Sequence, residues 1–287
     1  MAQGAANNQQ ANLISAGVPI TEDEFNRIRE LVKRNTGISL GSHKRDLVVS
    51  RLAQRLRKLN LSSFSEYLRL LEEAGDSGEL VNMINRITTN KTDFFREIHH
   101  FKYLTDVILP KITASGGSGK VRCWSAGCSS GQEPYTLAIT LQEFFAGKSG
   151  WDVKILATDL DTNMLHTADQ GIYQAEQLAP VDPDLVRKYF TKLSDGQYQV
   201  KPVLRNMITF KKFNFISHAT YNVRVPLDFI FCRNVMIYFD AQEKHDIVTK
   251  FAAVLKPHGY LFVGHSESLM MAKDIFNNIG PTIYQKV

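Results

Sequence analysis

A loop of small residues between a predicted strand and a predicted helix is where chemistry is first expected in this chain. Val121–Ala126 reads as a short buried strand, Gly127 to Gly131 follow the pattern G-x-x-x-G, and a helix begins at Glu133. A strand that turns through glycines into a helix brings backbone N–H groups and little side-chain bulk against a nucleotide-like ligand. The pattern therefore predicts a ligand site at Gly127 and Glu133.

The next predicted strand ends in an acid that suits the same ligand. Val153–Thr158 is mostly apolar and Asp159 follows it directly. A carboxylate in that place can accept hydrogen bonds from both hydroxyls of a ribose. Because the glycine pattern is not the G-x-G-x-x-G of pyrophosphate binding, the site favours a nucleoside without phosphates, and S-adenosylmethionine fits that description. The glycines alone fit a plain tight turn equally well, and Asp159 is what favours the ligand.

The composition narrows the class of protein. The chain has 287 residues, of which 44% are apolar and 22% charged, as is typical of a globular protein. No apolar run approaches the roughly 20 residues of a membrane-spanning helix, so a membrane protein is not expected. Residues 1–15 lack the blocks of a signal peptide, and we interpret them as the disordered tail of a cytoplasmic protein. The three cysteines form no C-x-x-C pair, so neither a disulfide framework nor a metal site is predicted.

Residues 16–88 carry helical signals only and predict an all-α N-terminal domain. Thr21 is an N-cap residue with Glu24 as the acid of a capping box. Apolar residues then recur at helical spacing. Further helices are expected from Ser42, over Ser63–Leu71 and over Glu79–Ile87.

Residues 121–287 alternate strands with helices, after a linker segment and a helix over residues 89–120. Leu227–Cys232 is almost entirely apolar, as expected of a parallel strand buried on both faces. The alternation predicts a doubly wound, Rossmann-like α/β sheet. A small antiparallel β insert is expected over about 189–213, because an Asp-Gly turn at Ser194–Gly196 separates two alternating segments.

Four stretches in this order resemble the chemotaxis receptor methyltransferase family, the CheR-type protein-glutamate O-methyltransferases. The resemblance covers nearly everything after the N-terminal tail, and the family has the same architecture of a helical domain, a methyltransferase domain and a small β insert. The stretches are Asn90–Arg96, Trp124–Tyr135, Ala157–Asp161 and Phe231–Phe239.

The resemblance implies the site residues and the reaction. The cofactor would be S-adenosyl-L-methionine, with S-adenosyl-L-homocysteine as product, and the methyl acceptor a glutamate on the cytoplasmic domain of a chemoreceptor. Arg96 and Tyr238 would orient that carboxylate. The residues that would bind the cofactor are Asn90, Thr92, Arg96, Gly127, Glu133, Asp159, Asn214, Phe215, Arg233 and Asn234.

A basic stripe on the predicted helix after Ser42 is a candidate docking surface for the receptor. Lys44, Arg51, Arg55 and Lys58 are separated by offsets that place them on one helical face. A glutamate-rich receptor helix would complement this charge. The alternative interpretation is an ordinary solvated helix face. The insert binds a C-terminal receptor peptide in some family members, but the short turn at Ser194–Gly196 argues against such a tether here.

Two other functions compete with the enzyme. One is a module that binds the cofactor and then a partner, but the presence of both Arg96 and Tyr238 favours catalysis. The other is a nucleic-acid methyltransferase, but the basic stripe is not interleaved with aromatic residues, so no nucleic-acid partner is expected. For Arg96 a structural salt bridge, and for Tyr238 a place in the buried core, remain the alternative interpretations.

Overall fold

The structure is a computed structural model that describes residues 18–73, 78–114, 119–194 and 196–287. The chain divides into two compact units, residues 1–89 and residues 90–287. The tail predicted over residues 1–15 lies outside the described residues. Among the residues that are described, no helix is both long and apolar enough to cross a membrane.

The first unit is helical, as predicted. The capping box at its start is present, because the side chain of Thr21 accepts from the N–H of Glu24 while the Glu24 carboxylate accepts from the N–H of Thr21. Apolar residues at helical spacing, such as Val48, Leu52 and Leu56, fill its core. The elements are α2 (Glu22–Thr36), η1 (Ser42–Lys44), α3 (Arg45–Lys58), α4 (Phe64–Glu73) and α5 (Gly78–Ile87).

The second unit begins with an irregular segment and a helical run that lead into its sheet. The run predicted as one helix consists of α6 (His99–Tyr103), a π-helical turn η2 (Leu104–Ile108) and α7 (Leu109–Ala114). Phe101, Leu104 and Ile108 are buried against the sheet. The segment 89–120, predicted as a linker with a helix, therefore contributes to the core of this unit. The loop after α7 lies mostly outside the described residues.

The main sheet has the order β6-β2-β1-β7-β8-β10-β9 among the described residues, with β10 antiparallel to both of its neighbours and the other pairs parallel. This confirms the doubly wound, Rossmann-like α/β fold. Its strands are β1 (Lys120–Ala126), β2 (Asp152–Asp159), β6 (Ile208–Lys212), β7 (Leu227–Cys232), β8 (Leu255–Val263), β9 (Phe276–Gly280) and β10 (Ile283–Lys286).

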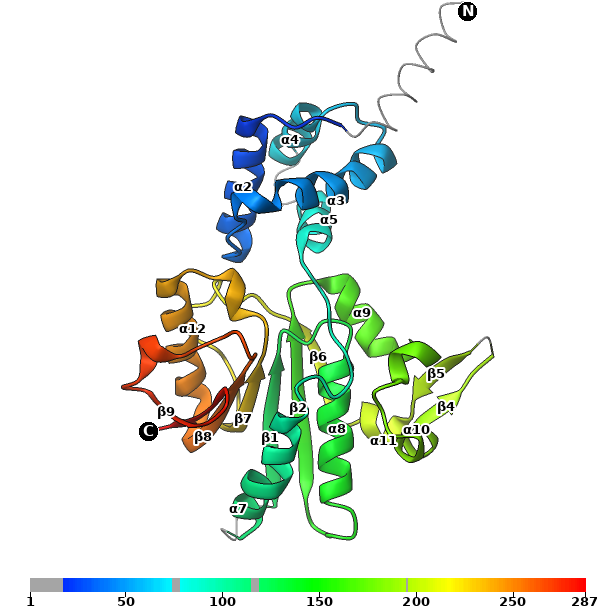
Figure 1. Cartoon of the computed structure of the whole chain (residues 1–287), viewed down its shortest axis with the longest axis vertical. Helices are drawn as coiled ribbons and strands as arrows, with labels where there is room; N and C mark the ends of the chain where they lie inside the picture. The colour runs from blue at the N-terminus through cyan, green and yellow to red at the C-terminus, as the bar shows by residue number, and fades with distance from the viewer. Residues whose placement is uncertain (1–17, 74–77, 115–118, 195) are drawn as a thin grey trace, which may run out of the picture. The chain divides into compact units, whose positions relative to one another are not determined.

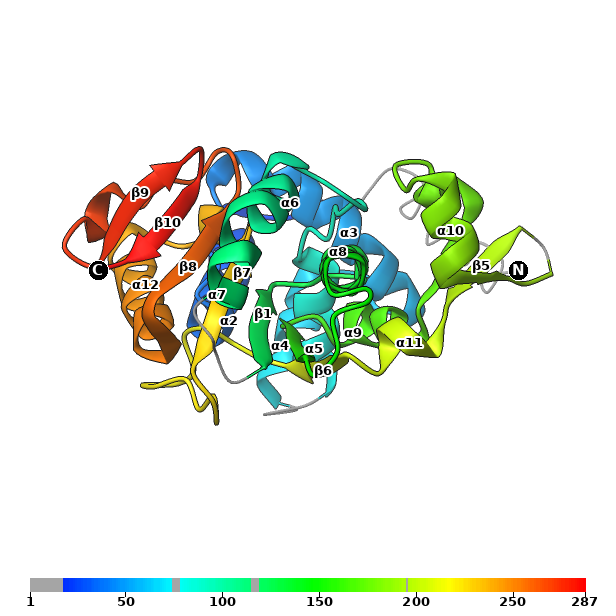
Figure 2. The same ribbon diagram turned by 90° about the horizontal axis from the view of Figure 1, so that it is seen from below.

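The central strand β7 is buried on both faces because helices cover both sides of the sheet (Figure 2). Phe229 and Phe231 join the core that includes α8 (Gln132–Phe144). Ile230 and Cys232 point to the opposite core, which includes α12 (Ala241–Val254). The alternation follows from the two-residue period of a strand. Helix α9 (Thr162–Gln170) contacts β2 and β6.

The small antiparallel sheet requires a correction to the prediction. It consists of β3 (Ile172–Gln174), β5 (Gln197–Val200) and β4 (Phe190–Lys192), and lies to one side of the main sheet with α10 (Pro183–Tyr189) and α11 (Pro202–Arg205) (Figure 1). The prediction of an insert over 189–213 was wrong at both ends. The missing strand is β3, and β6 pairs with β2 in the main sheet. Alternating apolar and polar residues on an exposed segment predict a strand, but they do not predict which other strand it pairs with.

Candidate active site

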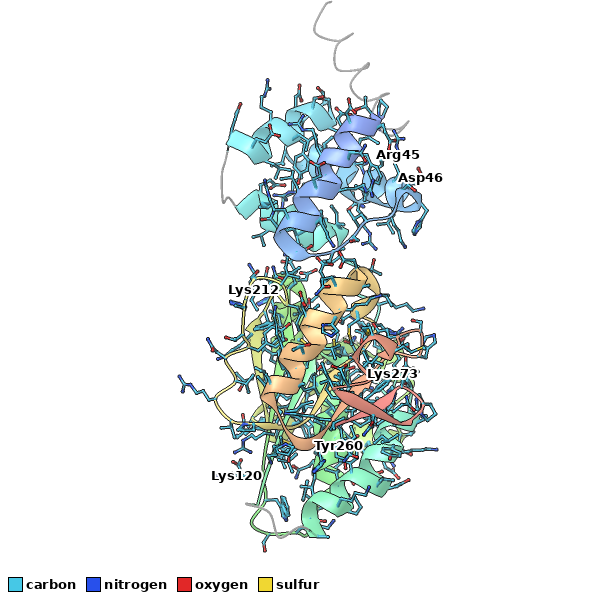
Figure 3. All side chains as sticks on the ribbon, turned by 90° about the vertical axis from the view of Figure 1, so that its left-hand side faces the viewer. Arg45, Asp46, Lys120, Lys212, Tyr260 and Lys273 are labelled. Carbon is cyan, nitrogen blue, oxygen red and sulfur yellow. The ribbon has the colours of Figure 1, made fainter. Side chains whose placement is uncertain are left out.

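The predicted site residues gather at the carboxyl ends of the parallel strands. Figure 3 shows Lys120, which starts β1, and Lys212, which ends β6, at opposite ends of the sheet. The loops that follow β1, β2 and β7 are therefore at the Lys212 end. Ligands of open α/β sheets bind at this edge.

The loop after β1 is tied to the end of β2. The N–H groups of Gly127 and Cys128 both donate to the carbonyl of Thr158, at 2.8 Å each. Gly127 has a φ of 92°, and a Cβ atom built on it would lie 2.3 Å from Cγ2 of Val235. This glycine is thus required by its left-handed backbone and by the close approach of the loop after β7.

Asp159 closes the same loop with its carboxylate. Its Oδ2 accepts from the N–H of Ser129 at 2.7 Å, and its Oδ1 accepts from the N–H of Asp161 at 2.9 Å. Burial raises the pKa of Asp159, although these backbone donors oppose the rise. Each carboxylate oxygen can accept a second hydrogen bond, so Asp159 retains capacity for the hydroxyls of a ribose.

Glu133 lies in the first turn of α8, as predicted, and is nearly buried. Its Oε1 accepts from the hydroxyl of Ser125 at 2.7 Å, and its Oε2 lies 3.3 Å from Nη1 of Arg233. Burial raises the pKa of Glu133, while the positive charges of Arg233 and Arg96 oppose that rise. Glu133 and Arg233 are therefore brought together at the ends of β1 and β7.

The segment 90–98 contacts the loop after β1. The amide of Asn90 donates to Oδ2 of Asp161 at 2.8 Å, and its carbonyl accepts from the hydroxyl of Ser129 at 3.0 Å. Thr92 is half-buried in the same segment. Asn90 is therefore attached to the loop that Asp159 closes.

Arg96 is half-buried between two residues of unusual backbone conformation. Phe95 and Glu97 have φ angles of 54° and 55°, in the left-handed region that side chains with a Cβ rarely adopt. The guanidinium of Arg96 donates to the carbonyl of Lys91 at 3.0 Å, and its carbonyl accepts from the guanidinium of Arg233. No carboxylate within 4.0 Å of Arg96 is recorded among the described residues, which argues against the structural salt bridge.

Tyr238 ends the short helix η4 (Met236–Tyr238) after β7 and is partly exposed. Its placement disfavours the alternative of a tyrosine in the buried core. A carboxylate that was not foreseen holds this loop: Glu267 accepts from the N–H groups of Asn234 at 2.8 Å and Ile237 at 3.2 Å. Asn234 itself has a φ of 59°.

Asn214 and Phe215 follow β6, and the structure separates their environments. Asn214 is half-buried, and its Oδ1 accepts from the N–H of Ile216 at 3.2 Å. The ring of Phe215 lies in an aromatic core with Trp124 and Phe251. The structure thus places the Phe215 side chain in the core, and a contact with a ligand would use its backbone.

The residues of the predicted basic stripe, which lie in η1 and α3, differ in their contacts and exposure. Arg55 is paired with Glu79 of α5, and the two side chains are only 12% and 10% exposed. Arg51 donates to the carbonyls of Ile87 and Thr88, at 2.7 Å each. Both arginines therefore hold α3 against α5. Lys44 and Lys58 are exposed.

Several residues of the site were not predicted from the sequence. Glu97 was detectable in principle, since it directly follows Arg96 in a motif. Glu267 follows β8 as an isolated acid, with no periodic or spacing signal that would have indicated its role. Ser125 and Ser129 lie inside the recognised loop motif but are small residues without distinctive chemistry.

Comparison with known proteins identifies the family. The family model described as "CheR methyltransferase, all-alpha domain" matches residues 23–88, and the model described as "CheR methyltransferase, SAM binding domain" matches residues 90–285. A "Chemotaxis protein methyltransferase" of Escherichia coli is 42% identical over 92% of this chain and 91% of its own length. A protein of the same name from Borreliella burgdorferi is 39% identical over 97% of this chain and 99% of its own.

The site suits S-adenosylmethionine, the cofactor that the family model names. Gly127 contributes no side chain to the loop between β1 and α8, which suits a ligand that approaches the backbone closely. Asp159 ends β2, Glu133 lies in the first turn of α8 after the adjacent strand β1, and neither belongs to a phosphate-binding pattern. The matched models and relatives together cover the two units, and the chain belongs to the CheR methyltransferase family, the S-adenosylmethionine-dependent methyltransferases of chemotaxis.

Proposed function

We propose that this protein methylates glutamate side chains on the cytoplasmic helices of a chemoreceptor, forming glutamate methyl esters for chemotactic adaptation. It would be a protein-glutamate O-methyltransferase acting in the cytoplasm, with S-adenosylmethionine as methyl donor and S-adenosylhomocysteine as product.

The position of Arg96 is the observation that carries the proposal. Its main chain is bound by Arg233, which also contacts Glu133, so it belongs to the predicted cofactor site. Its positive charge is close enough to oppose the raised pKa of Glu133. A half-buried cation at a methyl-transfer site suits an anionic acceptor such as a carboxylate.

A glutamate acceptor also fits the groups around the site. A free glutamate has a pKa of about 4.3, so it is already a nucleophilic carboxylate at neutral pH and needs no general base. The cofactor supplies an electrophilic methyl group on a sulfonium, whose transfer to a carboxylate oxygen requires no proton transfer. The protein's task is then to align the reacting groups and to limit the access of water.

We assign that alignment to Arg96 and Tyr238. A full ion pair with Arg96 would lower the nucleophilicity of the acceptor, so we assign Arg96 an orienting role. Arg96 already donates to the carbonyl of Lys91, which leaves its other N–H groups for the substrate. Tyr238 is partly exposed and has a hydroxyl that can donate to a carboxylate oxygen.

The receptor would dock on exposed lysines of the helical unit. We retain the four predicted docking residues Lys44, Arg51, Arg55 and Lys58, but their contacts distinguish two roles. Arg51 and Arg55 keep α3 in place through α5, whereas Lys44 and Lys58 present their charge to solvent. The small number of residues between the end of β4 at Lys192 and the start of β5 at Gln197 still disfavours a receptor-peptide tether at the insert. Truncating a receptor's C-terminal peptide should therefore leave its methylation unchanged.

The experiment is transfer of label from methyl-tritiated S-adenosylmethionine to purified cytoplasmic fragments of a chemoreceptor, followed by mild alkali. Volatile labelled methanol is expected, because a carboxyl methyl ester hydrolyses under these conditions. A receptor fragment with its methylation-region glutamates replaced by alanine serves as the matched control and should remain unlabelled. Alkali-stable label would contradict the proposal, as would equal labelling of the two fragments.

A further inference from the structure

Glu97, the residue after Arg96, is a nearly buried carboxylate at the centre of several polar contacts. Its side chain is 10% exposed. Its Oε1 lies 3.0 Å from Nδ1 of His265, and its Oε2 lies 3.4 Å from the guanidinium of Arg233. Burial favours a higher pKa for Glu97, but the hydrogen bonds from His265 and the charge of Arg233 hold that pKa below its ordinary value. Glu97 is therefore a charged group inside the protein.

Arg233 supplies a permanent positive charge beside Glu97. His100 also approaches Glu97, at 3.5 Å, but burial, together with the charge of Arg233, lowers the pKa of His100 to about 3. His100 is thus neutral at physiological pH. Arg233 is only 2% exposed, and its guanidinium is also 5.6 Å from the ring centre of Phe101. A buried arginine needs such counter-charges, because an unpaired buried charge is costly.

Arg233 connects Glu97 to two residues of the proposed site, Arg96 and Glu133. One of its nitrogens donates to the carbonyl of Arg96, and the other lies 3.3 Å from Glu133. If Glu97 lost its charge, Arg233 would be attracted more strongly to Glu133, its remaining carboxylate partner. That movement would alter the Glu133 acceptor and release the carbonyl of Arg96.

The backbone around Arg96 depends on such external restraints. The flanking residues Phe95 and Glu97 both adopt left-handed φ angles, which persist only when the surroundings impose them. On one side the N–H of Phe95 donates to the hydroxyl of Thr136 at 3.2 Å. On the other side the restraint comes from Arg233 and from the Glu97 side chain itself.

We propose that Glu97 is a positioning residue for methyl transfer: through Arg233 it fixes the main chain that carries Arg96 and sets the orientation of Glu133. Its part at Arg96 rests on the proposed function, because the role of Arg96 is part of that proposal. Its part at Glu133 concerns cofactor binding and is testable without any receptor.

The test compares Glu97→Gln with Asp228→Asn, a matched loss of a buried carboxylate charge. Asp228 lies near the start of β7, is 6% exposed, and is bonded to Lys256 at 2.6 Å, at the opposite end of the strand from Arg233. Both variants should lower the melting temperature, by roughly 5 to 10 °C. Only Glu97→Gln should also weaken S-adenosylhomocysteine binding in calorimetry, by about tenfold, and lower kcat by at least about tenfold.

The receptor KM separates positioning from general loosening of the fold. It should remain within about twofold for Glu97→Gln, because the docking residues are on the helical unit. A variant that loses melting temperature but keeps the wild-type cofactor affinity and kcat would overturn the inference, as would an equal loss of affinity in Asp228→Asn. If no receptor is methylated even by the wild type, the proposed function fails, whereas the affinity comparison still decides the role of Glu97 at Glu133.

A second variant keeps the inference testable should Glu97→Gln not fold. Glu97→Asp retains the negative charge but shortens the side chain by one methylene. The distance to the Arg233 guanidinium therefore increases, while the positive charge of Arg233 stays balanced. A kcat between those expected for wild type and Glu97→Gln, with a near-native melting temperature, supports positioning. A kcat equal to that of the wild type contradicts it, since geometry would then be unimportant.

Discussion

The carboxylate of Asp159 accepts a hydrogen bond from the N–H of Ser129, at 2.7 Å across the loop that joins β1 to α8. Ser129 has a φ of 48°, so a residue with a Cβ adopts a left-handed backbone at this point. The contact links the end of β2 to the loop after β1. Asp159 therefore helps to set the shape of this loop, and we propose that its remaining acceptor capacity serves the hydroxyls of a ribose.

Replacing Asp159 by asparagine should weaken cofactor binding about 10- to 100-fold, because the charged acceptor is lost and an amide N–H₂ would face backbone donors. Calorimetric titration with S-adenosylhomocysteine measures the change. Asp152→Asn is the matched control, because Asp152 starts the same strand with its side chain 51% exposed and should bind the cofactor as the wild type does. Equal affinities for wild type and Asp159→Asn would remove Asp159 from the binding site.

Cofactor affinity should fall on acidification. The fall should begin at a higher pH than it would if the acceptor were a carboxyl group with an ordinary pKa. Burial raises the pKa of Glu133, and protonation abolishes the charged acceptor. The stability effect of this group has the opposite sign: because its folded-state pKa lies above its unfolded value, protonation favours the folded state. Calorimetry from about pH 8 to pH 5, with thermal melts, separates the two. An affinity independent of pH in this range would contradict the expectation.

Arg55→Ala should destabilise the helical unit by about 3 kcal/mol, since it leaves Glu79 buried without its charge partner. Glu79 would then keep two neutral donors, the hydroxyl of Tyr67 at 2.8 Å and the amide of Asn82 at 3.3 Å, neither of which supplies a positive charge. Lys58→Ala, on the exposed side of the same helix, should change the free energy of unfolding by less than about 0.5 kcal/mol. Urea denaturation measures both. Similar values for the two variants would mean that the Arg55–Glu79 pair is not important for stability.

Exposed lysines of α3 and of the turn before it should control receptor docking through charge. The KM for a receptor fragment is expected to rise with ionic strength, because interactions between exposed charges are screened. The double variant Lys44→Gln, Lys58→Gln should raise KM at low salt and reduce its salt dependence, with kcat unchanged. The same two substitutions would refute docking at this surface if they left both KM and its salt dependence at wild-type values.

Tyr238→Phe should lower kcat by about 10- to 100-fold with nearly unchanged cofactor affinity, because it removes only the hydroxyl that we propose orients the acceptor. Steady-state kinetics and calorimetry provide the two readouts. Tyr260→Phe is the control, because Tyr260 lies in β8 toward the Lys120 end of the sheet (Figure 3). A matching loss of cofactor affinity in Tyr238→Phe would assign Tyr238 to cofactor binding instead.

Local features of the fold were predictable from the sequence because short segments decide them. The capping box of Thr21 and Glu24 needs only three residues of spacing, and the apolar run Leu227–Cys232 needs only the absence of polar side chains along most of one strand. Strand pairing depends on distant segments. Residues 208–212 therefore read as a strand of the insert until their parallel pairing with β2 placed them in the main sheet.

The sequence by itself determined the helical first unit, the alternation of strands and helices in the second, the family motifs, and the positions of Glu133 and Asp159 at a helix start and a strand end. Each of these features depends on neighbours along the chain. Only the tertiary structure decided which charged side chains form contacts within the protein and which remain exposed to solvent. Their spacing in the sequence predicts that Arg51 and Arg55 lie on one face of a helix. It does not predict that both side chains bind groups of α5 and the residue after it. Likewise, Glu97 and Glu267 gained their partners from residues far away in the chain, because burial and hydrogen bonding are properties of the assembled fold.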